Sequence, residues 1–425
     1  MTYPQEHTGS YYAASANDHS KYATLRGSVS ADVCVVGAGF TGISTAIFLA
    51  ERGYDVCVLE ANRVGFGASG RNGGQMIAGI SGENRITKHH GPGIEKQMWD
   101  MRWAGHRIIR ERVAKYGIAC DLKSGYLDVA IKERHLRDLE ADHARLSRHG
   151  FAGEFRLLSR EETRSTIGTD AYIGALFNGT NGHLHPLNLC AGEARVAASL
   201  GARLYEQSPV RSITHGDTVC VSTADGNVNA KFAVLAGNAY QFFNRKLRAR
   251  FFPVRSYIIA TEALTPEQVA DVNPQDLAVC DPNFVLEYFR LSADKRLLFG
   301  GRCNYFGEDP EEIRSQLRPR MQRVYPQLSG IGIDYAWGGT IAVPLNRVPQ
   351  LGRLAPNVFY AQGYSGHGVN VTHLVGEILA DAVAGTLERF DVFAGIKPIR
   401  IPGASVFANQ MVSLGMMYYG LKDRL

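Results

Sequence analysis

The stretch DVCVVGAGFTGISTAIFLAERGYDVCVLE, residues 32–60, decides the fold of this chain. Its first five residues form an apolar run that is typical of a buried strand. The pattern G-A-G-F-T-G follows, and apolar residues then recur at helical spacing until Gly53. A second apolar run ends at Glu60. The pattern predicts a strand–helix–strand unit and therefore a parallel sheet in an α/β protein.

The spacing of the three glycines predicts a dinucleotide site at the start of the helix. Gly37 allows a tight turn, Gly39 allows the backbone to approach a pyrophosphate, and Gly42 allows close packing of helix on strand. Free N–H groups at the helix N-terminus attract phosphate, and Glu60 is placed to accept hydrogen bonds from ribose hydroxyls. The alternative is a purely structural glycine turn. A second match to the spacing, residues 65–70, lacks the flanking strand and helix.

The segment ANRVGFGASGRNGGQ, residues 61–75, is too rich in glycine for a stable helix or strand. It directly follows the strand that ends at Glu60, so it is placed to run beside a bound cofactor. The mixture of glycine with Ser69, Asn72 and Gln75 favours ligand contact. The alternative is a flexible surface loop.

The rest of the chain alternates between predicted helices and strands. Helices are expected over 95–116, 134–149, 187–200, 309–324 and 370–385. Strands are expected over 125–130, 172–178, 229–240, 254–264 and 357–363, in short runs between 203 and 223, and in a hairpin over 283–301. Residues 334–354 carry glycine and proline signals that are typical of turns.

Composition and charge exclude several classes of protein. The 425 residues are 45% hydrophobic and 20% charged, which excludes wholesale disorder. The net charge of +5 is spread along the chain, so no basic patch for nucleic acid stands out. The seven cysteines contain no Cys-x-x-Cys pair, which argues against a zinc site or a disulfide framework. With no secretory signal and no apolar run near the roughly 18 residues of a membrane span, a cytoplasmic protein is expected.

Several dispersed motifs resemble one protein family over nearly the whole chain. They are HTGSYYAASAN (7–17), VGFGASGRNGGQ (64–75), GHLHPLNL (182–189), VLAGNAY (234–240), NRVPQLGRL (346–354), QGYSGHGV (362–369) and YYGLKDRL (418–425). Together they resemble the FAD-dependent amine and D-amino-acid oxidase superfamily, and they are most similar to the bacterial gamma-glutamylputrescine oxidases.

The resemblance implies an α/β fold of two interleaved domains. A Rossmann-like FAD-binding domain would comprise residues 31–90, 186–245 and 336–395. An α+β substrate domain with an antiparallel sheet would comprise residues 91–185 and 246–335. Residues 1–30 and 396–425 would be terminal extensions.

The same resemblance implies which residues hold FAD. These are Gly37, Gly39, Phe40, Thr41, Gly42, Glu60, Ala61, Ser69, Gly70, Arg71, Asn72, Gly73, Gly74, Gln75, Val210, Ala236, Gly237, Gly363, Tyr364, Ser365, Gly366, His367, Gly368 and Val369. Sarcosine-type relatives attach the flavin through a cysteine in the segment that matches 339–347, but GTIAVPLNR has none, so non-covalent FAD is expected. Those relatives also bind the substrate carboxylate with a lysine where this chain has Asn370, which favours a longer amine.

The implied reaction is oxidation of an amine, gamma-glutamylputrescine, to an aldehyde with release of ammonia and hydrogen peroxide, in polyamine catabolism. Dioxygen is the expected acceptor. The candidate residues of the substrate pocket are His367, Tyr288, Arg290, Tyr257, Trp337 and Tyr364. Tyr288 and Arg290 share one face of a strand, and an arginine there is suited to a carboxylate at the far end of the substrate. For Tyr257 and Trp337 the alternative is simple core packing.

Other interpretations stay open at the level of sequence. The enzyme could oxidise secondary amines such as pipecolate or sarcosine, or pass electrons to a quinone, and a flavin-bearing subunit without activity is a third alternative. Arg71 could activate oxygen or pair with phosphate. His183 and His185 have the i, i+2 spacing of a metal pair, but a structural loop is favoured and no metal is expected. The apolar stretch 411–420 is either an oligomer contact or core.

Overall fold

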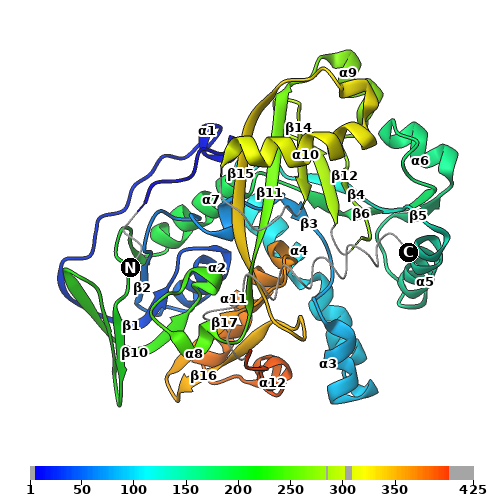
Figure 1. Ribbon diagram of the computed structural model, residues 1–425. Helices are drawn as coiled ribbons and strands as arrows, with labels where there is room; N and C mark the ends of the chain where they lie inside the picture. Colours follow the sequence, from blue (N-terminus) through cyan, green and yellow to red (C-terminus); the bar gives the residue numbers. More distant parts are fainter. Residues whose placement is uncertain (1–4, 284–285, 302–308, 402–425) are drawn as a thin grey trace.

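The computed structural model describes residues 5–283, 286–301 and 309–401, and in it two sheets form two lobes (Figure 1). The C-terminal stretch 411–420, the motif 418–425 and Cys303 lie outside the described residues. No helix in the described ranges is both long and apolar enough to cross a membrane.

The first sheet contains eight strands, and its centre is parallel. The strands are β1 (Gly27–Val36), β2 (Val56–Leu59), β7 (Arg203–Tyr205), β8 (Ser212–His215), β9 (Val219–Ser222), β10 (Gly226–Leu235), β16 (Gln350–Ala355) and β17 (Val358–Gln362). Their order is β16-β17-β10-β1-β2-β7, with the β8–β9 hairpin beside β10. The pairs β1–β2, β1–β10, β10–β17 and β2–β7 are parallel, so the predicted strand–helix–strand unit is confirmed.

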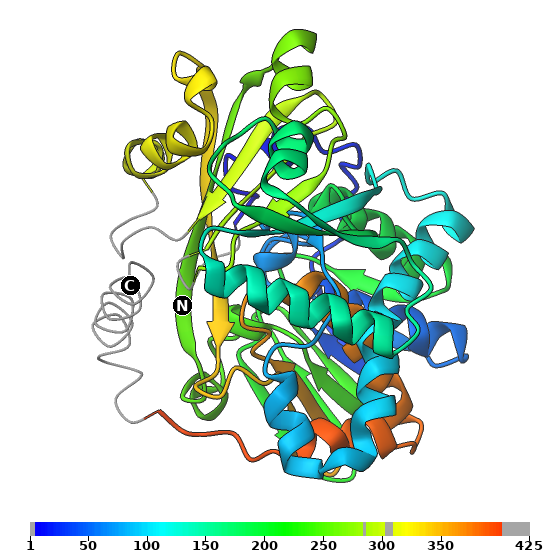
Figure 2. The ribbon, with the colours of Figure 1, turned by 90° about the vertical axis from the view of Figure 1, so that its right-hand side faces the viewer.

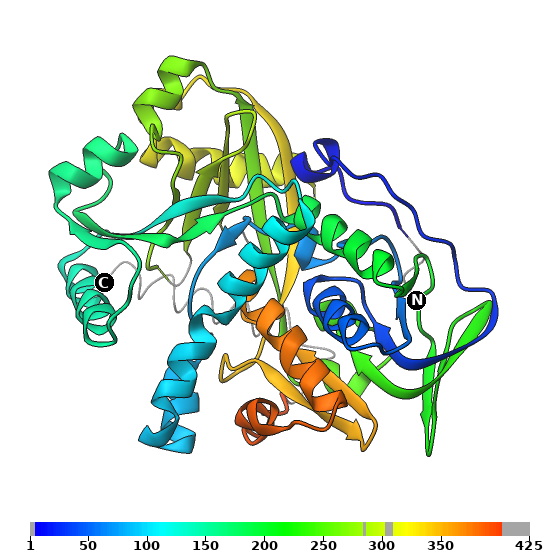
Figure 3. The same cartoon turned by 180° about the vertical axis from the view of Figure 1, so that it is seen from behind.

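A layer of helices covers one face of this sheet, and the layer is seen best from behind (Figure 3). There α7 (Pro186–Ser199), α2 (Phe40–Glu51) and α11 (Gly368–Val383) lie side by side. Gly42 permits α2 to pack closely on the turn that follows β1, because a Cβ atom on it would lie 1.8 Å from the carbonyl oxygen of Gly37. The helix α4 (Glu95–Tyr116) packs against α11 and leads into the second lobe.

The second sheet contains nine strands and is mostly antiparallel. The strands are β3 (Gln75–Met76), β4 (Lys123–Ala130), β5 (Phe155–Leu158), β6 (Gly174–His183), β11 (Phe252–Ala263), β12 (Ala278–Cys280), β13 (Glu287–Leu291), β14 (Arg296–Gly301) and β15 (Ile333–Val343). Their order is β15-β11-β14-β13-β12-β4-β6-β3, with β5 beside β6. The only parallel pair among these described strands is β12–β4.

The second lobe carries its own helices around this sheet. They are α5 (Glu133–Arg148), α6 (Arg160–Ile167), α9 (Pro266–Val272) and α10 (Pro310–Val324). In the view turned by 90° the teal helix α5 crosses in front of the sheets (Figure 2). A core of aromatic rings lies beneath α10, in which Phe289 stacks on Phe299 and meets Tyr325 edge to face. The remaining helices are α1 (Tyr11–Ala14), α3 (Glu83–His90), α8 (Arg245–Arg248) and α12 (Glu388–Ala394).

The interpretation of residues 334–354 as turns is wrong for most of the segment. It contains the long strand β15 and the strand β16, and only the residues between them form a connection. Glycines are common signals of turns, but in this strand they allow side chains of other segments to approach the backbone closely. A Cβ atom on Gly338 would lie 2.8 Å from the ring of Tyr257, and one on Gly339 would lie 3.3 Å from Cβ of Arg71.

The N-terminal segment packs onto the second sheet. Tyr12 is fully buried, and its ring centroid lies 5.2 Å from that of Trp337. The Tyr11 hydroxyl donates to Asp294 at 2.6 Å. β1 also begins upstream of residue 31, because Gly27 already pairs with Gly226. The division into domains remains a prediction, but residues 27–30 belong to β1 of the first sheet, and Tyr11 and Tyr12 pack against the second.

Candidate cofactor and substrate site

One large cavity of about 1420 Å³ lies where the two sheets meet. Its lining includes the ends of β1, β2 and β10 from the first sheet and residues of β11, β13 and β15 from the second. A site for one small molecule has a volume of about 300–1,000 Å³. The cavity therefore offers room for a dinucleotide and for a second molecule beside it.

The turn between β1 and α2 forms one end of the cavity. Gly37 has a φ of +107°, and a Cβ atom on it would lie 3.0 Å from the main chain of Ala236. A Cβ atom on Gly39 would lie 2.8 Å from Oγ of Ser69, which accepts a hydrogen bond from the Phe40 amide at 2.9 Å. The next amides of α2, including that of Thr41, have no partner within the helix. This end has the geometry of a pyrophosphate site.

Glu60 lies on the cavity just beyond the end of β2. Its carboxylate accepts hydrogen bonds from the amides of Ala38 at 2.8 Å and Asn62 at 2.9 Å. Burial raises the pKa of this carboxyl group, although both hydrogen bonds oppose the shift. Each oxygen keeps a lone pair for a further donor, so the position fits the predicted contact with ribose hydroxyls.

The glycine-rich segment 61–75 is held by many hydrogen bonds, so it is not a flexible surface loop. The Asn72 side chain donates to Ser69 O at 2.8 Å and accepts from the Gly74 amide at 2.8 Å. Gln75 donates to Val279 O at 2.9 Å and thereby ties the segment to β12. The segment lines the cavity from residue 66 to residue 75, with Gly70 and Gly74 behind the wall.

Tyr288 on β13 reaches the cavity from the second sheet. Its ring is enclosed by two glycines: a Cβ atom on Gly73 would lie 2.5 Å from it, and one on Gly300 would lie 2.1 Å from it. The Tyr288 hydroxyl lies 3.3 Å from Oγ of Ser256. The ring is therefore fixed in position beside the glycine-rich segment.

The connection from β17 to α11 forms another wall. The hydroxyl of Tyr364 lies 2.8 Å from Oγ1 of Thr41, and burial raises the pKa of this phenol. His367 is the N-cap residue of α11, and its Nε2–H donates to Ala78 O at 3.2 Å in the tautomer that fits this contact. Burial lowers the pKa of His367, so the ring is neutral near pH 7. The N-terminus of α11 opens on the cavity at Gly368.

Three of the six predicted pocket residues do not line the cavity. Arg290 is buried behind the glycine-rich segment, and its guanidinium donates to Gly73 O at 2.7 Å, to Leu184 O at 2.9 Å and to Leu291 O at 2.9 Å. A further bond reaches the hydroxyl of Tyr12 at 3.0 Å. The predicted role as a carboxylate ligand does not fit, because these bonds direct the guanidinium at main-chain carbonyls.

Trp337 and Tyr257 also belong to the packing around the site. Trp337 is buried, and its Nε1–H donates to Arg71 O at 3.0 Å. Tyr257 is buried against Gly338. The alternative of core packing therefore describes both residues better than a place on the cavity wall.

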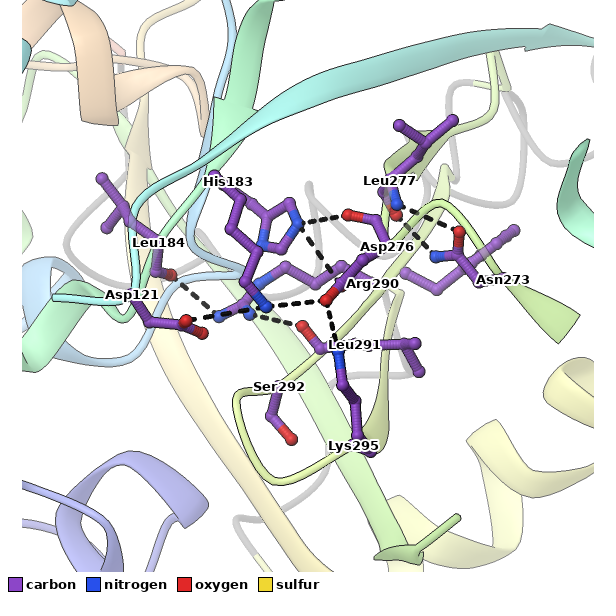
Figure 4. A network of polar contacts seen from close by, with 12 residues as sticks. Asp121, His183, Leu184, Asn273, Asp276, Leu277, Arg290, Leu291, Ser292 and Lys295 are labelled. Atoms are coloured by element: carbon purple, nitrogen blue, oxygen red, sulfur yellow. Dashed lines mark hydrogen bonds and ion pairs between the residues drawn. The ribbon is translucent and has the colours of Figure 1, made fainter. Parts of the chain in front are cut away.

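The neighbourhood of Arg290 also contains a polar network (Figure 4). His183 donates through Nε2 to Asp276 O at 2.7 Å, and Lys123 and Lys295 lie 2.6 and 2.7 Å from Oδ2 of Asp276. His185 instead caps α7, where its Nδ1 accepts from the Asn188 amide at 3.1 Å. Burial lowers the pKa of each histidine to about 3. Both side chains have protein partners, and the described residues contain no cluster suited to a metal ion.

Most of the residues that were predicted for the site meet on this one cavity. Its lining includes Gly37, Gly39, Phe40, Thr41, Glu60, Ala61, Ser69, Arg71, Asn72, Gly73, Gln75, Val210, Ala236, Gly237, Tyr288, Tyr364, Ser365, Gly366, His367, Gly368 and Val369. It does not include Gly42, Gly70, Gly74, Gly363, Tyr257, Arg290 and Trp337.

Sequence reasoning missed a charged wall at the far end of the cavity. Glu83 and Arg102 line it, and Arg347 lies nearby on the same cavity. These residues come from α3, from α4 and from the connection after β15. No motif or spacing links them in the sequence. The one local signal was Gly105, a glycine inside a predicted helix, which indicates that another segment packs closely against the helix at that point.

Comparison with known proteins agrees with this geometry. Residues 32–382 match the family model described as FAD dependent oxidoreductase. The chain is 43% identical to the gamma-glutamylputrescine oxidoreductase of Escherichia coli K12, with 99% of each chain covered. It is 40% identical to a probable oxidoreductase of Haemophilus influenzae over 99% of this chain and 98% of the relative. Glycine oxidase from Geobacillus kaustophilus has the same fold, with a TM-score of 0.71 at 21% identity over 87% of this chain and 100% of that one.

Proposed function

Because this chain belongs to the family of FAD-dependent oxidoreductases, we propose that it oxidises the primary amine of gamma-glutamylputrescine. The products would be an aldehyde, ammonia and, with dioxygen as the acceptor, hydrogen peroxide. The similarity to the E. coli gamma-glutamylputrescine oxidoreductase, 43% over essentially the whole of both chains, carries this proposal. A cytoplasmic location and an oligomeric state remain predictions from the sequence.

The cavity supports FAD as the cofactor. The glycines at 37 and 39 leave a cradle that side chains would fill, the start of α2 offers unpaired amides, and Glu60 offers carboxylate oxygens. We propose that FAD is held without a covalent bond. Cys280 is the one cysteine of the described residues that lines the cavity, and burial raises the pKa of its thiol well above the usual value, which disfavours the nucleophilic thiolate.

When bound, FAD supplies an acceptor for the hydride that leaves the carbon next to the amine nitrogen. The residues of this chain would position the reactants and set the local charge. The N–H groups at the start of α11 would stabilise negative charge on the ligand. Tyr288 would confine the amine, because the two flanking glycines fix its ring. Neutral His367 would add no positive charge beside the amine, and the raised pKa of Tyr364 would keep its phenol uncharged.

An anaerobic absorbance titration tests this function directly. The holoenzyme should show an oxidised flavin spectrum that bleaches with gamma-glutamylputrescine and returns with air, with one hydrogen peroxide formed per amine consumed. Pipecolate and sarcosine should leave the spectrum oxidised. Faster bleaching by either of these would contradict gamma-glutamylputrescine as the substrate. If the oxidised spectrum returned only after a quinone was added, dioxygen would be wrong as the acceptor. Release of free FAD by acid precipitation would support the non-covalent attachment.

A further inference from the structure

The far end of the cavity carries a largely shielded ion pair that the reaction itself does not use. Resting on the proposed function, we propose that Arg102 and Glu83 bind the α-amino-acid head of the gamma-glutamyl group. Arg102 would pair with its carboxylate and Glu83 with its ammonium group. The pair would then distinguish the gamma-glutamylated amine from the free diamine.

Both side chains face the cavity and are largely shielded from solvent. NH1 of Arg102 lies 2.8 Å from Oε2 of Glu83, and the two side chains are only 16% and 17% exposed. Both residues belong to the lining of the cavity. Nε of Arg102 is buried and has no hydrogen-bond partner among the described residues. A buried donor without a partner is costly, so this position favours an incoming acceptor.

The backbone beneath Arg102 is held from two sides. Its carbonyl oxygen accepts a hydrogen bond from Nδ2 of Asn370 at 2.9 Å and another from the amide of Gly79 at 3.3 Å. Oδ1 of Asn370 lies 3.1 Å from Nδ1 of His106. Asn370 is therefore engaged in placing α4, and the positive charge at this end of the cavity comes from Arg102 and the nearby Arg347.

Gly105 makes this arrangement possible. A Cβ atom at this position would lie 2.0 Å from the main-chain oxygen of Asn370, so only glycine lets α4 approach the start of α11 so closely. The approach brings Arg102 onto the same cavity as the N-terminus of α11. Two other ion pairs on α4 look different. Lys96–Asp100 and Arg107–Glu111 have side chains that are 56–88% exposed.

The local charge favours a ligand with a carboxylate. Oε1 of Glu83 also lies 3.5 Å from NH1 of Arg145, so one carboxylate serves two guanidinium groups. Burial lowers the pKa of Arg102, and an anionic ligand would relieve the cost of that desolvated charge. An α-amino-acid head brings one negative and one positive group, which matches Arg102 and Glu83. Putrescine has no carboxylate and would leave Arg102 with its unpaired donor.

The test compares two substrates on holoenzyme variants. Arg102→Gln should lower kcat/KM for gamma-glutamylputrescine by about 10- to 100-fold, the range for a lost hydrogen bond to a charged group, and chiefly through KM. It should change kcat/KM for putrescine by less than about threefold, within the spread of a neutral substitution. Arg102→Lys should recover part of the loss. The control is Arg107→Gln, on the same helix but exposed, which should change neither substrate.

A ligand that cannot react separates this inference from the proposed function. N5-butylglutamine has the same head but no terminal amine. The wild-type holoenzyme should bind it, seen as a perturbed flavin spectrum, and Arg102→Gln should weaken that binding to the same extent as KM. Equal binding by wild type and variant would overturn the inference, whatever substrate the enzyme oxidises. An equal loss of activity on gamma-glutamylputrescine and putrescine would also overturn it, since the pair would then only join α3 to α4.

Glu83→Gln provides a second test that does not depend on the folding of the Arg102 variants. It should weaken binding of N5-butylglutamine but not of the analogue that lacks the α-amino group. Loss of both ligands to the same degree would contradict the assignment of Glu83 to the ammonium group.

Discussion

The two ends of the cavity are built in different ways. At the nucleotide end, one strand–helix–strand unit, residues 32–60, supplies the turn and the free amides from its main chain and a single carboxylate from the side chain of Glu60. At the far end, the side chains of Glu83 and Arg102 come from two helices, and Asn370 from a third holds the backbone of Arg102. The first end recognises a ligand by backbone shape and the second by side-chain charge. Substitutions should therefore abolish cofactor binding at one end and change substrate preference at the other.

The strongest test of this contrast is Gly42→Ala at the nucleotide end. The new methyl group would lie 1.8 Å from the carbonyl oxygen of Gly37, where the backbone has no room to move. We expect the free energy of unfolding to fall by more than about 3 kcal/mol and FAD to be lost. Chemical denaturation and the ratio of flavin to protein absorbance measure both effects. Gly93→Ala is the control, because a Cβ atom there meets nothing within 4 Å.

Arg290→Gln tests the support behind the glycine-rich segment, which lies between the two ends. It removes charged hydrogen bonds to the carbonyl oxygens of Gly73 and Leu184, which stay buried. We expect a loss of about 2–4 kcal/mol in the free energy of unfolding and weaker binding of FAD, measured by thermal unfolding with and without added FAD. Arg137→Gln, at an exposed position of α5, should change neither quantity. Unchanged affinity for FAD would show that the segment needs no support from Arg290.

Gly105→Ala tests the far end. In an isolated helix, alanine is more favourable than glycine by about 1 kcal/mol. Here, however, the methyl group of alanine would lie 2.0 Å from the main-chain oxygen of Asn370. We expect a net loss of about 1–3 kcal/mol in the free energy of unfolding and a fall in kcat/KM for gamma-glutamylputrescine, while the purified protein keeps its FAD. Steady-state kinetics and flavin content check this. A stabilised variant with normal kinetics would mean that α4 and α11 do not pack as closely as described.

The smallest expected effect is that of His367 on the way kcat/KM depends on pH. Burial lowers the pKa of His367 from its ordinary 6.5, so the ring is neutral throughout pH 7–9 and adds no titration there. A primary amine has a pKa of about 10.4 and reacts in its neutral form. Between pH 7 and 9, kcat/KM should therefore rise by up to about tenfold per pH unit, while FAD content stays constant. The profile of His367→Asn should have the same shape, and a bell-shaped profile that this variant flattens would contradict the neutral ring.

The contrast between the two ends also explains what the sequence could predict. The turn at Gly37 and the position of Glu60 could be predicted, because residues adjacent in the sequence determine the backbone conformation of the strand–helix–strand unit. The orientation of Arg290 depends on which acceptors surround it, and strand periodicity carries no information on them. The approach of Arg102 to Asn370 joins residues that are 268 positions apart, so it appears only when α4 packs on α11. The strand β15 was missed for a related reason: its glycines are required by close contacts with Tyr257 and Arg71, which lie on other segments of the chain.

The buried Tyr12 has a consequence for how the chain matures after synthesis. Its hydroxyl meets Arg290, 278 residues further on, and its ring packs on Trp337. The segment around Tyr12 leaves the ribosome before the strands β13 and β15 and cannot dock until both strands have emerged and joined the second sheet. Such distant pairings form late, because the loop entropy must be overcome before they add stability. Protection of the residues around Tyr12 from proteases should therefore mark a late step of folding in a newly made chain.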